Sequence, residues 1–339
     1  MQPIKKILVI RLSSIGDIVL TTPLLRSLQR TWPEASIDYC TKAQFTSLLA
    51  ANPRISAIYT LEVPPTDGYD LVVDLQNNLR SHAIVRSLDK RHLVYYRKAN
   101  RKKWLLVQCK INFYGSYRSV VDRYRDALKK FTLSGDSLGC ELYPSSSERV
   151  FACTFFDGGK KTLALCFGAK HFTKRYPPGN FATLLTLLLR AEPLQILLLG
   201  GKEDAQQAAE IMAALSDQFQ PMVVNLAGNC SIMQTAAILE RCDAVLCNDT
   251  GLMHIASAFG KKLFVIFGSS SPAFGFLPYH APYELFQVEG LPCRPCSHIG
   301  RELCPRGHFR CMNDLSITLI AEHILDHFNC APEHHNNLV

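Results

Sequence analysis

The sequence has no long apolar run. Its first apolar stretch, Ile7–Ile10, has four residues, whereas a signal-peptide core has ~7–15 and a membrane span ~20. No later stretch reaches the ~18 uninterrupted apolar residues that indicate a spanning helix. These absences predict a cytosolic location and leave open contact with a membrane surface.

Three phosphate- and metal-binding motifs are also missing. No G-x-G-x-x-G follows the first predicted strand and no G-x-x-x-x-G-K-[ST] occurs, which argues against a dinucleotide oxidoreductase and a P-loop enzyme. No D-x-D pair occurs either. An enzyme that handles a diphosphate without such a metal-binding pair must use protein cations and helix N-termini. We therefore predict no cofactor for catalysis.

At 339 residues the chain is long enough for two domains. Short apolar strands such as Lys6–Ile10 alternate with amphipathic helices, and a second such series follows the polar segment 143–149. Repeated strand-plus-helix units predict an α/β fold with doubly wound parallel sheets, which bind ligands at the carboxyl ends of their strands. The predicted parts are residues 1–150, residues 151–314, and a C-terminal helix and tail over 315–339.

Positive charge is concentrated in one segment. Residues 80–130 contain fifteen Lys or Arg against three Asp, a local charge of +12 in a chain whose net charge is +8. Such a segment concentrates anionic partners, although a run of charge can also be a plain solvated surface. It lacks the interleaved aromatic motif of RNA-binding domains, so we predict no nucleic-acid partner.

Asp17 lies in the segment RLSSIGDIV, directly after the first predicted strand. Ser13 and Ser14 can cap the helix that follows, and Gly16 lets the backbone approach a ligand closely. A carboxylate in this first turn can act as a general base. Its alternative role is only to complement the positive end of the helix dipole.

A second candidate site is the segment CNDTGLMHIASAFG, which follows the apolar strand AVLC. Asp249 or Thr250 is the predicted N-cap of a helix that ends near Ala258, and a helix N-terminus binds phosphate well. His254 follows Thr250 by four residues, so both side chains can face one ligand. An ordinary capped helix with a solvated histidine is the alternative.

Three further polar residues follow predicted strands. Lys174 can neutralise a diphosphate as a point charge, and Glu203 can accept hydrogen bonds from ribose hydroxyls. Ser269 belongs to the turn GSSSP, whose hydroxyls and amides suit phosphate or sugar oxygens. Each of these features alone also fits a basic loop, an exposed acid or a plain turn.

Four of the thirteen cysteines are clustered near the end of the second domain. Their pattern is Cys293-x2-Cys296-x7-Cys304-x6-Cys311. Four thiols within nineteen residues fit an all-thiolate structural zinc site by ligand count, although the second half lacks a matching C-x-x-C. Disulfides or an unliganded loop of thiols are the alternatives.

Three segments, in this order, resemble the signature segments of glycosyltransferase family 9, the ADP-heptose:lipopolysaccharide heptosyltransferases: RLSSIGDIVLTTPLLRSLQ, TKRYPPGNF and NDTGLMHIASAFGKKLFVIFGSSSP. The strand–helix rhythm extends the resemblance over nearly the whole chain. Tyr176 stands where the family often has tryptophan. The resemblance implies a GT-B architecture, with an N-terminal Rossmann-like acceptor-binding domain facing a C-terminal Rossmann-like nucleotide-sugar-binding domain across a cleft.

The resemblance also implies residue roles in an inverting, metal-independent transfer of heptose from ADP-heptose to the lipopolysaccharide inner core. Asp17 would be the general base, Lys174 would bind the donor diphosphate, Glu203 the ribose, and Asp249 the hydroxyls of the donor sugar. Three residues would complete the phosphate and sugar site: Thr250, Gly251 and His254. The basic segment 80–130 would bind the anionic acceptor, with peripheral contact at the inner face of the inner membrane.

Two other functions remain open on the sequence alone. The motif residues would contact phosphate and hydroxyl groups that many nucleotide sugars share. A GT-B glycosyltransferase with another nucleotide sugar is therefore the first alternative. A non-catalytic protein that binds anionic ligands through the basic segment is the second.

Overall fold

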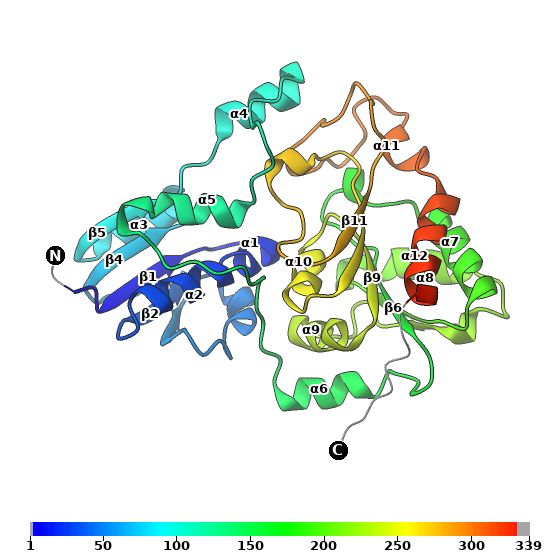
Figure 1. The fold of residues 1–339 in the computed structure, drawn as a ribbon, viewed down its shortest axis with the longest axis horizontal. Helices are drawn as coiled ribbons and strands as arrows, with labels where there is room; N and C mark the ends of the chain where they lie inside the picture. The colour runs from blue at the N-terminus through cyan, green and yellow to red at the C-terminus, as the bar shows by residue number, and fades with distance from the viewer. Residues whose placement is uncertain (1–2, 331–339) are drawn as a thin grey trace.

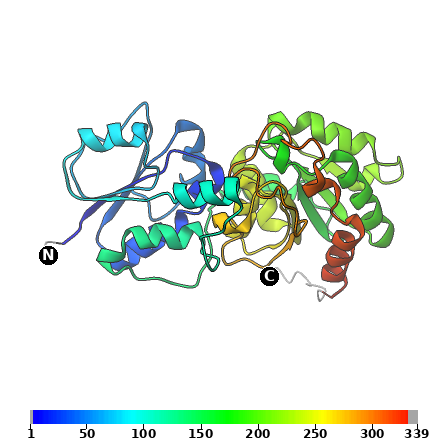
Figure 2. The same ribbon diagram turned by 90° about the horizontal axis from the view of Figure 1, so that it is seen from above.

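The computed structural model describes residues 3–330, which form two lobes side by side, each built on one parallel β-sheet (Figures 1 and 2). This arrangement confirms the predicted α/β class and its two facing Rossmann-like sheets. The predicted tail beyond residue 330 lies outside the described residues. Among residues 3–330, no helix combines the length and the apolar composition needed to span a bilayer.

The N-terminal lobe has five parallel strands in the order β3-β2-β1-β4-β5. These strands are β1 (Lys6–Ile10), β2 (Ser36–Cys40), β3 (Ala57–Tyr59), β4 (Tyr69–Asp74) and β5 (Lys90–Tyr95). Its helices and helical turns are α1 (Ile15–Val19), α2 (Thr22–Thr31), η1 (Ala43–Leu48), α3 (Leu79–Ser87), α4 (Asn100–Trp104), η2 (Leu105–Cys109), α5 (Val120–Ala127) and η3 (Lys129–Phe131).

Alternating side chains of β1 face the two layers of helices. Ile7 belongs to the apolar cluster that includes Leu24 of α2 and Tyr124 of α5. Leu8 belongs to the cluster on the opposite face, which includes Ile84 of α3. Because helices cover both faces, β1 is a continuous apolar run without polar alternation.

The C-terminal lobe has six parallel strands in the order β11-β10-β9-β6-β7-β8. These strands are β6 (Thr162–Cys166), β7 (Gln195–Leu199), β8 (Val223–Asn225), β9 (Ala244–Asn248), β10 (Lys262–Ile266) and β11 (Tyr283–Phe286). Its helices are α6 (Ser146–Cys153), α7 (Pro178–Ala191), α8 (Ala205–Ala213), α9 (Ile232–Arg241), α10 (Gly251–Ala258), α11 (Arg310–Asn313) and α12 (Ile317–Cys330). Shorter helical turns are η4 (Phe172–Lys174), η5 (Lys202–Asp204), η6 (Gln220–Met222) and η7 (Pro272–Phe274).

The connection between the lobes contains a helix rather than only a polar linker. Ser145 caps α6 by accepting a hydrogen bond from the backbone N–H of Glu148, whose carboxylate returns to the backbone N–H of Ser145. This reciprocal capping box explains why a serine-rich segment becomes helical. Helix α6 packs against α9, so the predicted boundary at residues 150/151 falls inside an element of the C-terminal lobe.

Both sheets have a switch point where their strand order reverses. In the N-terminal sheet this point lies between β1 and β4, and in the C-terminal sheet between β6 and β9. Loops that leave the carboxyl ends of such strands form the ligand crevice of open α/β sheets. Asp17, Lys174 and Asp249 lie in the segments that directly follow β1, β6 and β9.

Candidate active site

Asp17 occupies the third position of α1, where it is held by two neighbours. The backbone N–H and the hydroxyl of Ser14 donate to Asp17 Oδ2 at 3.2 and 3.0 Å. Arg11 Nη2 lies 2.5 Å from Asp17 Oδ1. Burial alone would raise the pKa of Asp17, but the Arg11 guanidinium and the Ser14 hydrogen bonds outweigh it and lower the pKa. The carboxylate is therefore ionised and fixed in orientation at neutral pH.

Asp249 lies at the carboxyl end of β9, directly before α10. Lys174 Nζ lies 2.7 Å from Asp249 Oδ2, and the Ser270 hydroxyl donates to the same oxygen at 2.6 Å. Burial opposes ionisation, but Lys174 and Ser270 lower the pKa of Asp249. The loops after β6, β9 and β10 thus converge on one buried carboxylate.

The N-terminus of α10 has open hydrogen-bond donors. Thr250 is the N-cap residue, in extended conformation, and its side chain makes no capping hydrogen bond. The helix ends at Ala258 and is followed by Gly260 at φ +64°, as the sequence predicted. Uncapped N–H groups carry the positive end of the helix dipole, so this terminus can bind a phosphate oxygen.

His254 is 4% exposed and is close enough to both Asp249 and Asp17 for their charges to act on it. Burial lowers the pKa of His254 to about 4, although the charges of Asp249 and Asp17 oppose the shift. Within residues 3–330, its Nδ1 has no hydrogen-bond partner. The imidazole is therefore neutral at pH 7, and one of its buried nitrogens is free for a ligand.

Helices α1 and α10 meet at the boundary of the two lobes (Figure 1). A Cβ on Gly16 would lie 2.4 Å from Cδ2 of His254, and a Cβ on Gly251 would lie 3.0 Å from Cβ of Ile15. A side chain at Gly16 would therefore force a shift at the contact, and one at Gly251 would be tight against Ile15. The contact brings Asp17 of one lobe and the α10 terminus of the other to the same place.

Glu203 and Asp204 differ sharply in surroundings, although they are adjacent in η5. Glu203 is exposed and its carboxylate folds back beside Gly201. Asp204 is 6% exposed, accepts from the backbone N–H of Gly201 at 3.0 Å and lies 3.1 Å from Arg175 Nη2. Asp204 thereby ties the loop after β7 to the loop that contains Lys174.

Sequence reasoning missed Asp204 because it selected the first acid after the strand. The signal that could have found it is its position as N-cap residue of α8. In the turn after β10, the serine that contacts Asp249 is likewise the residue after the one selected from the sequence. The hydroxyl of Ser269 donates to Thr173 Oγ1 at 2.9 Å, whereas it is Ser270 that contacts Asp249.

Comparison with known proteins identifies the family. The model of glycosyltransferase family 9 (heptosyltransferase) matches residues 66–305. The chain belongs to this family. Lipopolysaccharide heptosyltransferase 2 of Salmonella typhimurium is 28% identical over 297 residues, which cover 79% of this chain and 84% of that protein.

Two solved structures share the fold over almost the whole chain. The structure of ADP-heptose LPS heptosyltransferase II from Escherichia coli has a TM-score of 0.74 and 23% identity, and covers 96% of this chain and 98% of its own. A family 9 glycosyltransferase from Veillonella parvula has a TM-score of 0.77 and 18% identity, with coverage of 98% and 99%. These structures show the fold, and the family match and the heptosyltransferase relative show that the chain is a glycosyltransferase.

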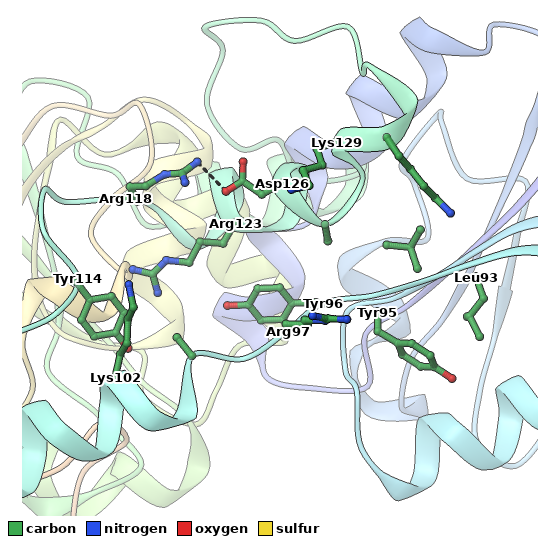
Figure 3. A pocket seen from close by; sticks show the side chains of 14 residues that line it. Leu93, Tyr95, Tyr96, Arg97, Lys102, Tyr114, Arg118, Arg123, Asp126 and Lys129 are labelled. Carbon is green, nitrogen blue, oxygen red and sulfur yellow. Dashed lines mark ion pairs between the residues drawn. The ribbon is translucent and has the colours of Figure 1, made fainter.

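The basic segment of this family 9 chain surrounds a cavity of about 900 Å³ in the N-terminal lobe (Figure 3). The ring of Tyr114 lies beneath two cations, with its centroid 4.8 Å from the Arg123 guanidinium carbon and 5.9 Å from Lys102 Nζ. Arg118 pairs with Asp126 at 2.8 Å at the edge of the cavity. Five other lining residues are polar or basic: Tyr95, Tyr96, Arg97, Lys129 and Lys130.

The four clustered cysteines lie between β11 and α12, three of them in loop segments and Cys311 in the short helix α11. Cys293 Sγ lies 3.9 Å from Nε2 of His308, and Cys311 is buried. Over residues 3–330, no three His, Cys, Asp or Glu side chains gather as a group that could hold a metal ion. The zinc prediction therefore continues to depend on the spacing in the sequence.

Proposed function

We propose that this chain transfers heptose from ADP-heptose to the inner core of lipopolysaccharide, in one inverting step without a metal ion, with Asp17 as the general base. The observation that supports the proposal is the contact between α1 and α10, which brings the helix that contains Asp17 next to an N-terminus that can bind a phosphate oxygen. The named activities of the Salmonella typhimurium and Escherichia coli relatives support the choice of sugar and acceptor.

In this mechanism Asp17 removes the proton from the acceptor hydroxyl as its oxygen attacks the anomeric carbon of the donor. The bond between that carbon and the diphosphate breaks, and ADP leaves with the bonding electrons. Arg11 and Ser14 hold Asp17 ionised and oriented for this proton transfer. Attack from the side opposite the leaving group inverts the configuration at the anomeric carbon.

The C-terminal lobe stabilises the departing ADP. Lys174 and the N–H groups of Thr250 and Gly251 supply positive charge where the diphosphate accumulates negative charge. Without the donor, Lys174 and Asp249 form an ion pair at 2.7 Å. When the donor binds, Lys174 pairs with the diphosphate instead, and a sugar hydroxyl donates a hydrogen bond to Asp249.

Three further residues complete the proposed donor site. Nδ1 of His254 has no hydrogen-bond partner within the described residues, so it can bind a sugar or phosphate oxygen. Glu203 is exposed and able to turn toward ribose hydroxyls. Ser269 belongs to the turn after β10 that forms one wall beside Asp249.

The cavity in the N-terminal lobe is the proposed acceptor site. Inner-core saccharides carry carboxylates and phosphates, which arginine binds bidentately. Arg97, Arg118, Arg123 and Lys102 surround the cavity and match such a ligand in charge. A nucleotide-sugar enzyme with this acceptor works in the cytoplasm, at the inner face of the inner membrane, which we propose as its location.

A structural zinc ion bound by Cys293, Cys296, Cys304 and Cys311 is a separate proposal, based on ligand count and sequence spacing. Catalysis does not depend on it in the mechanism above. Metal analysis of the purified reduced protein tests it: one zinc per chain supports the site, and the absence of stoichiometric zinc or iron contradicts it.

The proposed reaction is tested by incubating the chain with ADP-heptose and a heptose-deficient core acceptor, with and without EDTA. We expect the acceptor to gain the mass of one heptose in both samples, with inverted anomeric configuration in the NMR spectrum of the product. Transfer from another ADP- or UDP-sugar in place of ADP-heptose would identify a different donor. Activity abolished by EDTA and restored by a divalent ion would contradict the metal-independent step.

A further inference from the structure

The long segment between β5 and α5 projects from the N-terminal lobe. Residues 97–118, which we call the docking loop, contain α4 and η2 and project beyond the sheet at one edge (Figure 1). Apolar side chains on it face solvent instead of a core. Their exposed fractions are 59% for Trp104, 49% for Ile111, 54% for Phe113 and 45% for Tyr117.

The docking loop is also strongly basic. It contains seven Lys or Arg and no acid: Arg97, Lys98, Arg101, Lys102, Lys103, Lys110 and Arg118. Exposed aromatic and aliphatic side chains next to unbalanced positive charge are typical of segments that lie in the interface of an anionic bilayer. Tryptophan and tyrosine prefer that interface because their rings are apolar with one polar atom.

The docking loop contacts the C-terminal lobe through a hydrogen bond of Lys110. Lys110 Nζ donates to the backbone oxygen of Val107 at 2.6 Å and to that of Pro295 at 2.7 Å. The loop that contains Pro295 has two further exposed apolar side chains, Ile299 at 56% and Leu303 at 77%. The loop of the C-terminal lobe that Lys110 contacts thus also has exposed apolar side chains.

The base of the docking loop belongs to the acceptor cavity. Arg97, Lys102, Tyr114 and Arg118 line that cavity, whereas Trp104, Ile111 and Phe113 do not (Figure 3). One surface thus leads from exposed apolar side chains to a pocket lined with cations. This continuity suits an acceptor whose acyl chains stay in a bilayer while its anionic saccharide enters the pocket.

We propose that the docking loop binds the surface of a bilayer rich in anionic phospholipid, with Trp104 and Phe113 in the interface and the lysines and arginines on the headgroups. This inference rests on the proposed function in that it assumes a lipid-linked acceptor. Binding of the bilayer itself requires neither donor nor acceptor, so it can be measured separately.

The chain contains only two tryptophans, Trp32 and Trp104, which makes fluorescence a direct test. Trp32 packs edge-on against Phe131 with ring centroids 5.7 Å apart, so Trp32→Phe leaves Trp104 as the single reporter. Vesicles of equal parts phosphatidylcholine and phosphatidylglycerol should shift its emission to the blue, and brominated acyl chains should quench it. Unchanged emission with these vesicles would overturn the proposal.

Cosedimentation of the unmodified chain with the same vesicles gives a second measurement. The double variant Trp104→Ser/Phe113→Ser should lower the partition coefficient at least about tenfold, because it removes two large apolar side chains from the bilayer interface. The control Leu79→Ser removes an apolar side chain that is 87% exposed on α3 and should leave binding unchanged. Equal loss in both variants would contradict a specific docking surface.

Two further outcomes separate this proposal from its rivals. The double variant should transfer sugar normally to a delipidated, soluble acceptor but poorly to acceptor held in vesicles. If neither the parent chain nor any variant transfers sugar, the proposed function is wrong. The vesicle measurements still decide the membrane proposal, because they use neither donor nor acceptor. Tighter binding of the docking loop to single-stranded RNA than to vesicles, or concentration-dependent dimerisation through it, would overturn the membrane assignment.

Discussion

The buried imidazole of His254 links the stability of the chain to pH. Its pKa is about 4 in the folded chain against 6.5 for an ordinary histidine. Between these values the unfolded chain binds a proton that the folded chain does not, so the free energy of unfolding should fall as pH drops from about 6.5 to 4. The shift corresponds to a loss of up to about 3 kcal/mol.

Urea unfolding measured from pH 7 to pH 4 tests this linkage. The variant His254→Asn should lose that part of the pH dependence, because it has no titrating group at this position. His280→Asn is the matched control: His280 is exposed and has φ +51°, which asparagine tolerates. Identical pH dependence in the parent chain and His254→Asn would contradict the assignment of a buried neutral imidazole.

Lys174 should determine affinity for the donor diphosphate. Hydrogen bonds to charged groups contribute ~1.5–3 kcal/mol, so Lys174→Met should weaken ADP binding by about 10- to 100-fold in calorimetric titration. The control is Lys170→Met, which removes an exposed lysine from the same loop and should change little. Equal affinity in the parent and Lys174→Met would remove Lys174 from the diphosphate site.

Most of the candidate residues could be found from the sequence because they follow apolar strands. The spacing alone placed Asp17 and Asp249 at strand ends, where the structure brings both to the lobe boundary. It could not distinguish Glu203 from Asp204, because their difference is burial and the ion pair with Arg175, which depend on tertiary contacts. Nor could it show that Lys174 and Asp249 pair.

At the scale of elements, the close approach of α1 and α10 depends on glycine. Gly16→Ala places a methyl group 2.4 Å from Cδ2 of the buried His254, so either the imidazole or α1 itself must shift. Displacing reacting groups by about 1 Å can lower the rate about 100-fold, so kcat should fall by about 10- to 100-fold. The sugar-transfer assay measures this.

Gly179→Ala is the matched control for Gly16→Ala. Nothing lies within 4 Å of a Cβ at Gly179, which is also the second residue of α7. Alanine is the better helix former, so this variant should transfer sugar normally and be slightly more stable. Full activity in Gly16→Ala with an unchanged melting temperature would show that the distance between α1 and α10 does not matter.

Apolar strands were predicted more completely than polar ones. The runs that became β1, β6 and β9 are continuous and buried, so their composition identified them. Strand β5, KRHLVY, and strand β11, YELF, were missed because charged residues precede or interrupt their apolar residues and leave no long continuous apolar run. Such a strand is defined by pairing with its neighbour, which the sequence does not display.

At the scale of the whole molecule, the two lobes are joined by a shared apolar core and by polar contacts. One cluster of buried residues runs from Ile18 and Val19 of α1 to Met253 and Ile255 of α10. Arg123 of α5 also donates to the backbone oxygens of residues 273 and 274 across the boundary at 3.1 and 2.9 Å. The site between α1 and α10 therefore exists only when both lobes are folded together.

The central claim is that Asp17 of one lobe acts on a donor held by the other. Asp17→Asn keeps the size of the side chain but cannot accept the proton. General-base catalysis contributes ~10²–10⁴-fold, so kcat should fall by about that factor while donor affinity stays within about twofold. The control is Asp70→Asn, which removes an acid that pairs with Arg91 at 3.2 Å. Asp70 lies near the N-terminal end of β4, whereas Asp17 follows the C-terminal end of β1.

The most direct single test is the turnover number of Asp17→Asn with saturating ADP-heptose and core acceptor, measured beside calorimetric ADP binding on the same sample. The predicted result is intact ADP binding with turnover reduced by at least about 100-fold. Turnover equal to that of the parent chain would contradict a catalytic Asp17 and, with it, the shared site between the lobes.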